Sequence, residues 1–258
     1  MTKSPWQSFL TQTAEGAGKV LLKYFRKTLQ ISIKRGAGIV TDADTAAEEF
    51  ILKRIRKQFP ESSVIAEESG ESMGSGEYCW ILDPLDGTTN FAHGFPFFCV
   101  SIGLYRGKEA VAGVVYHPVS GECFFAEKGK GAFLGKTRLH VSKVKKMSMA
   151  LFGTGFYYAK GKQLSDEMHL FHRVNEEVLG VRRPGAAALD LAYVAAGRYD
   201  GFWERGLSPW DVAAGYLLIT EAGGKISDYT GKPTTIFSKE VLATNRLTHS
   251  NMVRLLTP

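Results

Sequence analysis

The sequence predicts a mixed α and β protein in which an α+β half precedes an α/β half. Three observations predict this class. Apolar residues recur at helical spacing over residues 6–25 and again over 46–59. Short β-rich runs separated by turns cover residues 98–134, which is typical of an antiparallel meander. After residue 147, helical and strand-like segments alternate.

Composition places the chain among ordinary globular proteins. It has 258 residues, of which 44% are hydrophobic and 22% are charged. Wholesale disorder is therefore excluded, and a core can form without disulfide bonds. The length fits one large domain or two packed halves. A polar, basic connector at 143–146 divides an expected α+β half, 1–142, from an α/β half, 143–258, within one compact unit.

The charge balance is mildly basic, with 32 Lys and Arg against 26 Asp and Glu. This excess of six is consistent with an anionic substrate and gives weak support for nucleic-acid binding. The connector lysines Lys143, Lys145 and Lys146 have no aromatic residues between them. We therefore expect no nucleic-acid contact there.

The three cysteines, Cys79, Cys99 and Cys123, are odd in number, lack C-x-x-C spacing and lie in apolar runs. This pattern is typical of reduced, buried thiols in a cytoplasmic protein. The first residues lack the apolar core of a signal peptide, and no run approaches the roughly 18 apolar residues of a membrane span. We therefore expect a soluble, cytoplasmic protein without membrane contact.

The first elements have distinct signals. A single apolar stripe predicts a helix over 6–25. Two glycines within 31–40 predict a short hairpin or a mobile loop. A second helix should begin after Asp42 or Asp44 and end at Pro60.

The later elements follow from apolar runs and from glycines at their ends. Strands are expected over 64–66 and 78–82, ahead of the meander. Glycine at 197 and the pair at 223–224 are typical helix C-terminal signals. The expected second half comprises strands over 149–153, 201–204, 225–227 and 241–243 and helices over 163–179, 185–197, 211–222 and 247–256.

One segment has the strongest chemical signal: Trp80-Ile81-Leu82-Asp83-Pro84-Leu85-Asp86-Gly87-Thr88-Thr89-Asn90-Phe91. An apolar strand ends there in two carboxylates separated by a rigid proline, so both can point at one spot. Oxygen ligands without His or Cys suit Mg²⁺ rather than zinc. The Gly-Thr-Thr run can open a helix whose free N–H groups favour an anion such as phosphate. The two aspartates could instead shape a turn and cap a helix, but the full combination favours metal-assisted phosphoester hydrolysis.

Four other acidic residues are weaker signals. Glu67 and Glu68 follow an apolar run, where adjacent carboxylates are costly unless a cation neutralises them, although a solvated loop is the simpler interpretation. Asp211 lies at a helix start behind Trp210, where capping is the default interpretation. The flanking Trp and Pro also suggest a buried, fixed carboxylate, and Glu204 at the end of an aromatic strand is similar.

Two motifs resemble the signatures of the inositol monophosphatase family. The run from Asp83 to Phe91 is similar to the first signature. Trp210-Asp211-Val212-Ala213-Ala214-Gly215, followed by Glu221-Ala222-Gly223-Gly224, is similar to the second. Their order, their spacing and the chain length also match, so the resemblance covers nearly the whole chain. It implies the family's α+β fold, a layered αβαβα sandwich.

The resemblance implies two to three Mg²⁺ ions in each active site. A first ion would be held by Glu67, Asp83 and the backbone carbonyl of Leu85. A second would be held by Asp83, Asp86 and Asp211. Glu67 would also contact a third, weaker ion, with Glu68 close by.

The resemblance also implies roles in phosphate and water binding. Gly87 and Thr88 would bind the phosphate at the helix start. Thr88 would also hold the attacking water, which Asp44 or Glu67 would polarise. Asp44 ends the run 39–44, which is similar to the family's V-T-x-x-D pattern.

Substrate selectivity is expected on the second half. Gly185, Ala187 and Glu204 match family positions that contact the hydroxyl-bearing ring of the substrate. Arg205 stands where animal enzymes tend to have an apolar residue, and it would either bind a second phosphate or form a salt bridge. Gly38 falls where the family often has an acidic residue. The loss of that carboxylate would loosen the third metal site.

The implied activity is Mg²⁺-dependent hydrolysis of a phosphate monoester, above all myo-inositol monophosphate, by a lithium-sensitive homodimer. Fructose-1,6-bisphosphatase or dual activity and histidinol-phosphate phosphatase are alternatives. A 3′-phosphoadenosine 5′-phosphate phosphatase is disfavoured because Thr89-Asn90 stands where those relatives have Lys-Glu. A non-catalytic protein that binds RNA or transcription factors would be expected to lack a metal ligand, and none is missing.

Overall fold

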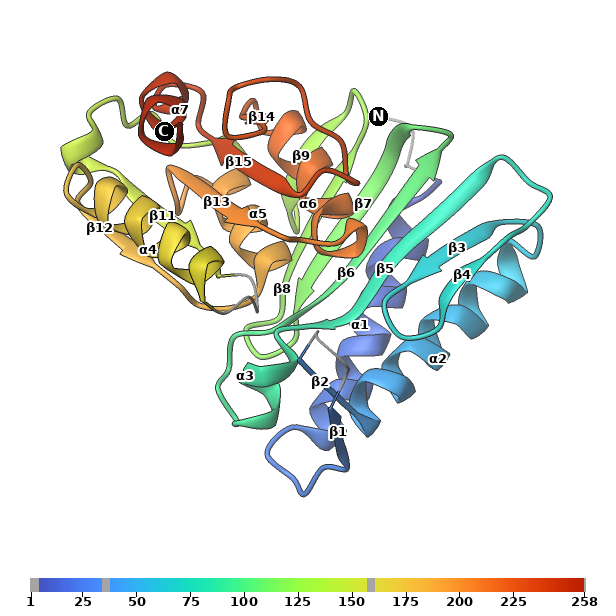
Figure 1. Cartoon of the computed structure of the whole chain (residues 1–258). Coiled ribbons are helices and arrows are strands. Elements are labelled where there is room, and N and C mark those ends of the chain that lie inside the picture. Colours follow the sequence, from blue (N-terminus) through green and yellow to red (C-terminus); the bar gives the residue numbers. More distant parts are fainter. Residues whose placement is uncertain (1–4, 34–37, 157–160, 258) are drawn as a thin grey trace.

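The computed structural model describes residues 5–33, 38–156 and 161–257. An eight-stranded and a five-stranded β-sheet alternate in it with layers of helices (Figure 1). Among the described residues, no helix is long and apolar enough to cross a bilayer. The helices are α1 (Gln7–Tyr24), α2 (Asp42–Gln58), α3 (Thr88–Ala92), α4 (Lys162–Asn175), α5 (Ala187–Ala195), α6 (Pro209–Glu221) and α7 (His249–Leu256).

The first sheet lies entirely before the connector at 143–146. Its strands are β3 (Ser63–Ala66), β4 (Gly70–Ser72), β5 (Tyr78–Asp86), β6 (Cys99–Arg106), β7 (Glu109–His117), β8 (Glu122–Glu127), β9 (Gly131–Leu134) and β10 (Thr137–Arg138). They are ordered β10-β9-β8-β7-β6-β5-β3-β4. All neighbours are antiparallel except β3 and β5, which run parallel.

The second sheet lies entirely after the connector. Its strands are β11 (Leu151–Thr154), β12 (Gly180–Arg182), β13 (Gly201–Arg205), β14 (Lys225–Ser227) and β15 (Glu240–Thr244). They are ordered β12-β11-β13-β15-β14, with β11 parallel to both of its neighbours. Because β15 runs antiparallel to both β13 and β14, the sheet is mixed.

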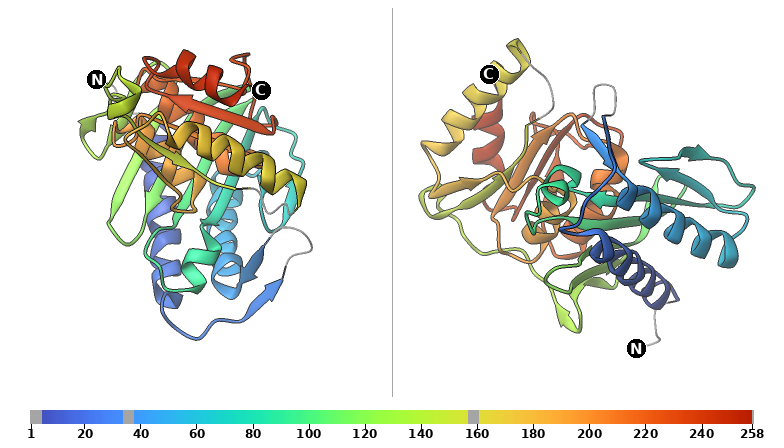
Figure 2. Two further views of the ribbon diagram at one scale, coloured as in Figure 1. Left: turned by 60° about the vertical axis from the view of Figure 1, so that its left-hand side comes forward. Right: turned by 90° about the horizontal axis from the view of Figure 1, so that it is seen from below.

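Three apolar cores hold the layers together. The first joins α1 and α2 to one face of the eight-stranded sheet. The second joins the other face of that sheet to α5, α6 and one face of the five-stranded sheet. The third joins the remaining face of the five-stranded sheet to α4 and α7. Figure 2 shows the same succession of layers from two further directions. The order is α, β, α, β, α, so the predicted sandwich is confirmed.

A small hairpin completes the fold near α3. Its strands β1 (Ile31–Ile33) and β2 (Ile39–Thr41) pair antiparallel, so the segment is a hairpin rather than an open loop. The predicted turn at 36–38 lies partly outside the described residues. Thr41 caps α2, and the helix accordingly begins at Asp42.

Some expected boundaries were wrong. The strand expected to end at Leu82 continues to Asp86, and the helix after Gly87 is only five residues long. The helix expected to reach Leu179 ends at Asn175. The short strands β4, β10 and β12 and a turn of 3₁₀-helix over Met147–Met149 were not predicted.

Candidate active site

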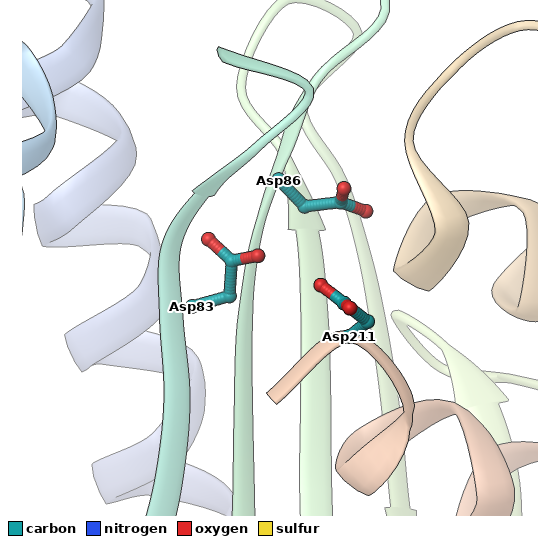
Figure 3. A group of neighbouring side chains, drawn as sticks. All are labelled: Asp83, Asp86 and Asp211. Atoms are coloured by element: carbon teal, nitrogen blue, oxygen red, sulfur yellow. The ribbon is translucent and has the colours of Figure 1, made fainter. Parts of the chain in front are cut away.

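Three aspartates converge where the two halves meet. Asp83 and Asp86 lie on β5 and Asp211 lies in the first turn of α6. One carboxylate oxygen from each lies within 4.8 Å of the others. Figure 3 shows the three side chains as neighbours, two of them from β5 and one from α6. Residues from distant parts of the sequence thus form one compact oxygen cluster.

An irregularity in β5 explains how Asp83 and Asp86 share this cluster. Residues three apart on a regular strand point to opposite faces of the sheet. The pairing of β5 with β6 shifts register between Asp83 and Asp86, at the step that contains Pro84. Proline cannot donate a ladder hydrogen bond, so a bulge at this position is the expected result. The bulge turns both carboxylates to the same side.

Backbone N–H groups fix all three aspartates. Each carboxylate accepts at least one such hydrogen bond, which holds its orientation. Two of these bonds are local, and the bond to Asp86 comes from the start of α5 in the other half. The bonds run from Leu85 N to Asp83 Oδ1 (2.9 Å), from Ala188 N to Asp86 Oδ2 (2.7 Å) and from Ser208 N to Asp211 Oδ2 (2.7 Å).

The raised pKa values of the three aspartates indicate that a bound cation would stabilise their ionised forms. Burial, followed by repulsion from Glu67, raises the pKa of Asp83 well above its ordinary value. Burial also raises the pKa of Asp86 to about 7 and places the pKa of Asp211 well above its ordinary value. Buried carboxylates this close together repel one another, which is energetically costly, and Lys239 offsets only part of this repulsion at Asp211. An all-oxygen donor set of this charge fits a hard divalent cation.

The Glu67-Glu68 pair lies at the end of β3, next to this cluster. Glu67 lines the same cavity as the aspartates, and its charge raises the pKa of Asp83, Asp86, Asp211 and Asp44. Glu68 does not line the cavity. The structure thus brings Glu67 to the site and leaves Glu68 at its edge.

Asp44 reaches the site through Thr88. Its carboxylate is fully buried in the first turn of α2, where it completes a capping box with Thr41. The Thr88 hydroxyl lies 3.1 Å from both Asp44 Oδ1 and the carbonyl oxygen of Leu85, so either can accept its proton. Burial raises the pKa of Asp44 to about 6. Asp44 therefore lies behind Thr88, one hydrogen bond away from the cavity.

One cavity of about 390 Å³ unites most of the predicted residues. Gly87, which lines this cavity, has a φ of +93°, and a Cβ there would lie 3.0 Å from the Phe97 carbonyl oxygen, so the backbone at this position favours glycine. Of the predicted site residues, Asp44 and Glu68 do not line the cavity. The predicted positions that line it are Glu67, Asp83, Leu85, Asp86, Gly87, Thr88, Gly185, Ala187, Glu204, Arg205 and Asp211.

Arg205 is held by carboxylates of its own chain. Its guanidinium pairs with Glu167 at 2.6 Å and with Glu240 at 2.8 Å. It also lies over the ring of Tyr229, with Cζ 4.8 Å from the centroid. These contacts favour the salt-bridge interpretation of Arg205 over a receptor for a second phosphate.

Sequence reasoning missed several residues of the site. Asn90 belongs to the first motif, but its link to the other half was not foreseen: its amide donates to the Pro184 carbonyl at 2.8 Å. Glu48 is buried and holds the loop that follows β3. Its position one helical turn after Asp44 was the available signal. Gly155 also lines the cavity, and no local pattern marks it.

Comparisons with known proteins agree with this geometry. The model of the inositol monophosphatase family matches residues 2–257. An inositol-1-monophosphatase of Rhizobium meliloti is 46% identical over 235 residues, covering 90% of this chain and 88% of the relative. The Nus factor SuhB of Pseudomonas aeruginosa is 42% identical over 262 residues, covering 98% and 96%.

Two solved structures are similar to this chain at comparable sequence identities. The extragenic suppressor protein suhB of Bartonella henselae has a TM-score of 0.95 and 40% identity, covering 98% of this chain and 99% of that one. The inositol monophosphatase of Anabaena has a TM-score of 0.86 and 42% identity, covering 98% and 96%. Both the sequence and the fold are therefore matched along almost the full chain, and the match supports a phosphatase. The chain belongs to the inositol monophosphatase family.

Proposed function

We propose that the protein is a Mg²⁺-dependent phosphate monoester hydrolase that converts myo-inositol monophosphate to myo-inositol and phosphate. The observation that carries this proposal is the cluster of three aspartates in the wall of a cavity that also contains Thr88 and Glu204. The cluster fits a divalent cation, and the rest of the cavity offers groups for a phosphate and for hydroxyls.

The metal assignment follows the family pattern. The proposed ligands of one ion are Glu67, Asp83 and the Leu85 carbonyl, and those of a second are Asp83, Asp86 and Asp211. Glu67, with Glu68 nearby, would contact a third ion. When bound, Mg²⁺ lowers the pKa of the attacking water, neutralises phosphate charge and stabilises the leaving alkoxide.

Thr88 and Asp44 form the proposed water-orienting pair. A threonine hydroxyl that donates its proton to a carboxylate keeps its lone pairs for an incoming water. The 3.1 Å contact between Thr88 Oγ1 and Asp44 Oδ1 has this arrangement. Since Asp44 is itself held by the Thr41 N–H at 2.8 Å, the pair has a fixed direction.

Phosphate and polyol are assigned to opposite parts of the cavity. Gly87 and Thr88 would contact the phosphate, next to the aspartates on β5. Gly185, Ala187 and Glu204 would contact the polyol hydroxyls, because they line the cavity on the side of the second half. Burial raises the pKa of Glu204 well above its ordinary value, so Glu204 can also donate a hydrogen bond when protonated.

Other relatives of this chain suggest a second candidate function. Some relatives are named Nus factor SuhB, at identities close to those of the named phosphatases. A non-catalytic binding role is the alternative that these names suggest. The complete aspartate cluster favours the enzyme, because a binding role alone does not require three converging buried carboxylates.

A phosphate-release assay tests the proposal. The substrates are myo-inositol 1-phosphate, fructose 1,6-bisphosphate, histidinol phosphate, 3′-phosphoadenosine 5′-phosphate and an aryl phosphate. We expect the highest kcat/KM on the inositol phosphate, complete loss with chelator, and recovery with Mg²⁺. Full activity after exhaustive chelation, or no release from any substrate with Mg²⁺, would overturn it.

A further inference from the structure

We propose that Glu48 is a positioning residue that holds Glu67 in place for metal binding, an inference that rests on the proposed function. Glu48 lies in the middle of α2 and is 3% exposed. Its Oε2 accepts the N–H of Glu68 at 3.0 Å, and its Oε1 accepts the N–H of Ser69 at 2.9 Å. One buried carboxylate thus binds two successive N–H groups of the loop after β3.

These contacts complete the anchoring of a three-residue segment. The N–H of Glu67 donates to the Leu82 carbonyl at 3.2 Å, which continues the pairing of β3 with β5. The next two N–H groups are those that Glu48 accepts. Strand pairing therefore fixes the start of the segment and Glu48 fixes its end. The backbone of Glu67 has little freedom between these two anchors.

The placement of Glu48 ties this loop to the rest of the site. Asp44 lies one helical turn earlier on α2, and residues four apart share a helix face. The same face therefore bears Asp44, which contacts Thr88, and Glu48, which contacts the loop of Glu67. A single rigid helix sets the distance between the proposed water-orienting pair and a proposed metal ligand.

The chemistry requires a carboxylate at position 48. Both of its side-chain oxygens accept a hydrogen bond from a backbone N–H, so both atoms at the end of this side chain must be acceptors. Among the described residues no Lys or Arg pairs with Glu48, so the N–H groups of the loop are its observed stabilising contacts. A glutamine would present an NH₂ group to one of these N–H donors. One hydrogen bond would then be lost and the loop would loosen.

The test compares Glu48→Gln with Glu49→Gln, which removes the same charge from the exposed neighbouring residue. The first measurement is Mg²⁺ binding to the metal-free proteins by calorimetry. Loss of a group that orients a metal ligand typically weakens binding about tenfold or more, and we expect this for Glu48→Gln. Glu49→Gln should stay within about twofold of the unaltered protein.

The second measurement is phosphate release as a function of Mg²⁺ concentration. For Glu48→Gln, the half-saturating Mg²⁺ concentration should rise, while kcat at saturating Mg²⁺ should recover most of its normal value. If Glu48→Gln does not fold, Glu48→Asp replaces it, because the shorter carboxylate keeps the charge but cannot reach both N–H groups. Unchanged Mg²⁺ affinity in a folded variant would overturn the inference. Absence of Mg²⁺ binding by the unaltered protein would instead overturn the proposed function.

Discussion

Gly155 leaves the space that the carboxylate of Glu204 occupies. A Cβ at position 155 would lie 2.1 Å from Glu204 Oε2 and 2.3 Å from Oε1. Both residues line the same cavity, at the ends of neighbouring strands β11 and β13. The colliding atoms are the far end of a flexible side chain, so a larger residue would displace the carboxylate rather than disrupt the sheet.

Gly155→Ala should therefore change substrate selectivity while the fold remains intact. We expect kcat/KM for myo-inositol 1-phosphate to fall roughly tenfold, because a displaced Glu204 loses its hydrogen bonds to the polyol. An aryl phosphate, which lacks such hydroxyls, should be affected much less. Gly180→Ala on the edge strand β12 is a matched control. In a Glu204→Ala background, Gly155→Ala should have no further effect; an additional tenfold loss there would refute the coupling.

The aspartate cluster predicts the effect of removing single charges. Asp86→Asn and Asp211→Asn preserve side-chain volume but remove one charge each from the proposed metal site. Turnover should fall about a hundredfold or more in each variant, since a lost ligand to the reacting centre costs several kcal/mol. Circular dichroism should show an unchanged fold. Near-normal turnover at low Mg²⁺ would contradict the assignment of that residue.

The raised carboxyl pKa values predict how Mg²⁺ stabilises the fold at different pH. The pKa values of Asp44 and Asp86 are about 6 and 7 in the folded protein, above the value of roughly 4 in an unfolded chain. Between about pH 4 and pH 7 the metal-free folded state therefore binds more protons than the unfolded chain, and its stability falls as pH rises across this window. Cations compete with these protons.

Thermal unfolding with and without Mg²⁺ checks this prediction. At a Mg²⁺ concentration about 100 times Kd, the increase in Tm should be roughly 5–10 °C at pH 8. The increase should shrink steadily toward pH 5.5. An increase that does not depend on pH would show that protons and Mg²⁺ do not share these carboxylates.

His249 predicts a separate pH effect in the second half. It is 3% exposed, and its ring nitrogens lie 3.0 Å from the Ser227 hydroxyl and 2.9 Å from the Thr244 hydroxyl. Burial lowers its pKa to about 4. The unfolded chain therefore takes up the proton first as pH falls below 6.5, and stability is lost between pH 6.5 and 4. The contribution is about 3 kcal/mol.

Denaturant unfolding of His249→Gln measures this contribution. Relative to the unaltered protein, the variant should lose about 3 kcal/mol less stability between pH 7 and pH 4. The aspartate cluster is the same in both proteins, so its opposite pH dependence cancels in the comparison. Parallel pH profiles would mean that the pKa of His249 is not lowered in the folded state.

The ion pairs of Arg205 predict a structural role. Arg205→Leu leaves Glu167, which is 5% exposed, without its cation. The free energy of unfolding should fall by about 1–3 kcal/mol. Activity should fall equally on inositol monophosphate and on fructose 1,6-bisphosphate. A tenfold selective loss on the bisphosphate would instead show that Arg205 contacts a second phosphate.

Local patterns were enough to identify much of the site and the fold class. Asp83, Asp86 and Thr88 lie within six consecutive residues, so their types and spacing indicated a metal and an anion together. The long helices α1 and α2 and the meander were predicted because each has a regular apolar period. The bulge that turns Asp83 and Asp86 to one side was not predicted, since it depends on the pairing of β5 with β6.

The parts that were missed depend on contacts between distant residues. Glu48 holds residues 20 and 21 positions away, and Arg205 pairs with residues 35 and 38 positions away. No local pattern records such partners. The strands β4 and β12 are three residues long and lie at sheet edges, where neighbouring strands rather than intrinsic preference determine pairing.

The aspartates that converge at the site belong to both halves of the chain. Asp83 and Asp86 are on the first sheet, and Asp211 is on a helix packed against it. A cation held by all three would join the halves as a reversible cross-link and close a long loop of chain. Any opening that moves α6 from β5 would have to release the ion first. Saturating Mg²⁺ should thus raise the free energy needed to separate α6 from β5, beyond what the apolar core between them already provides.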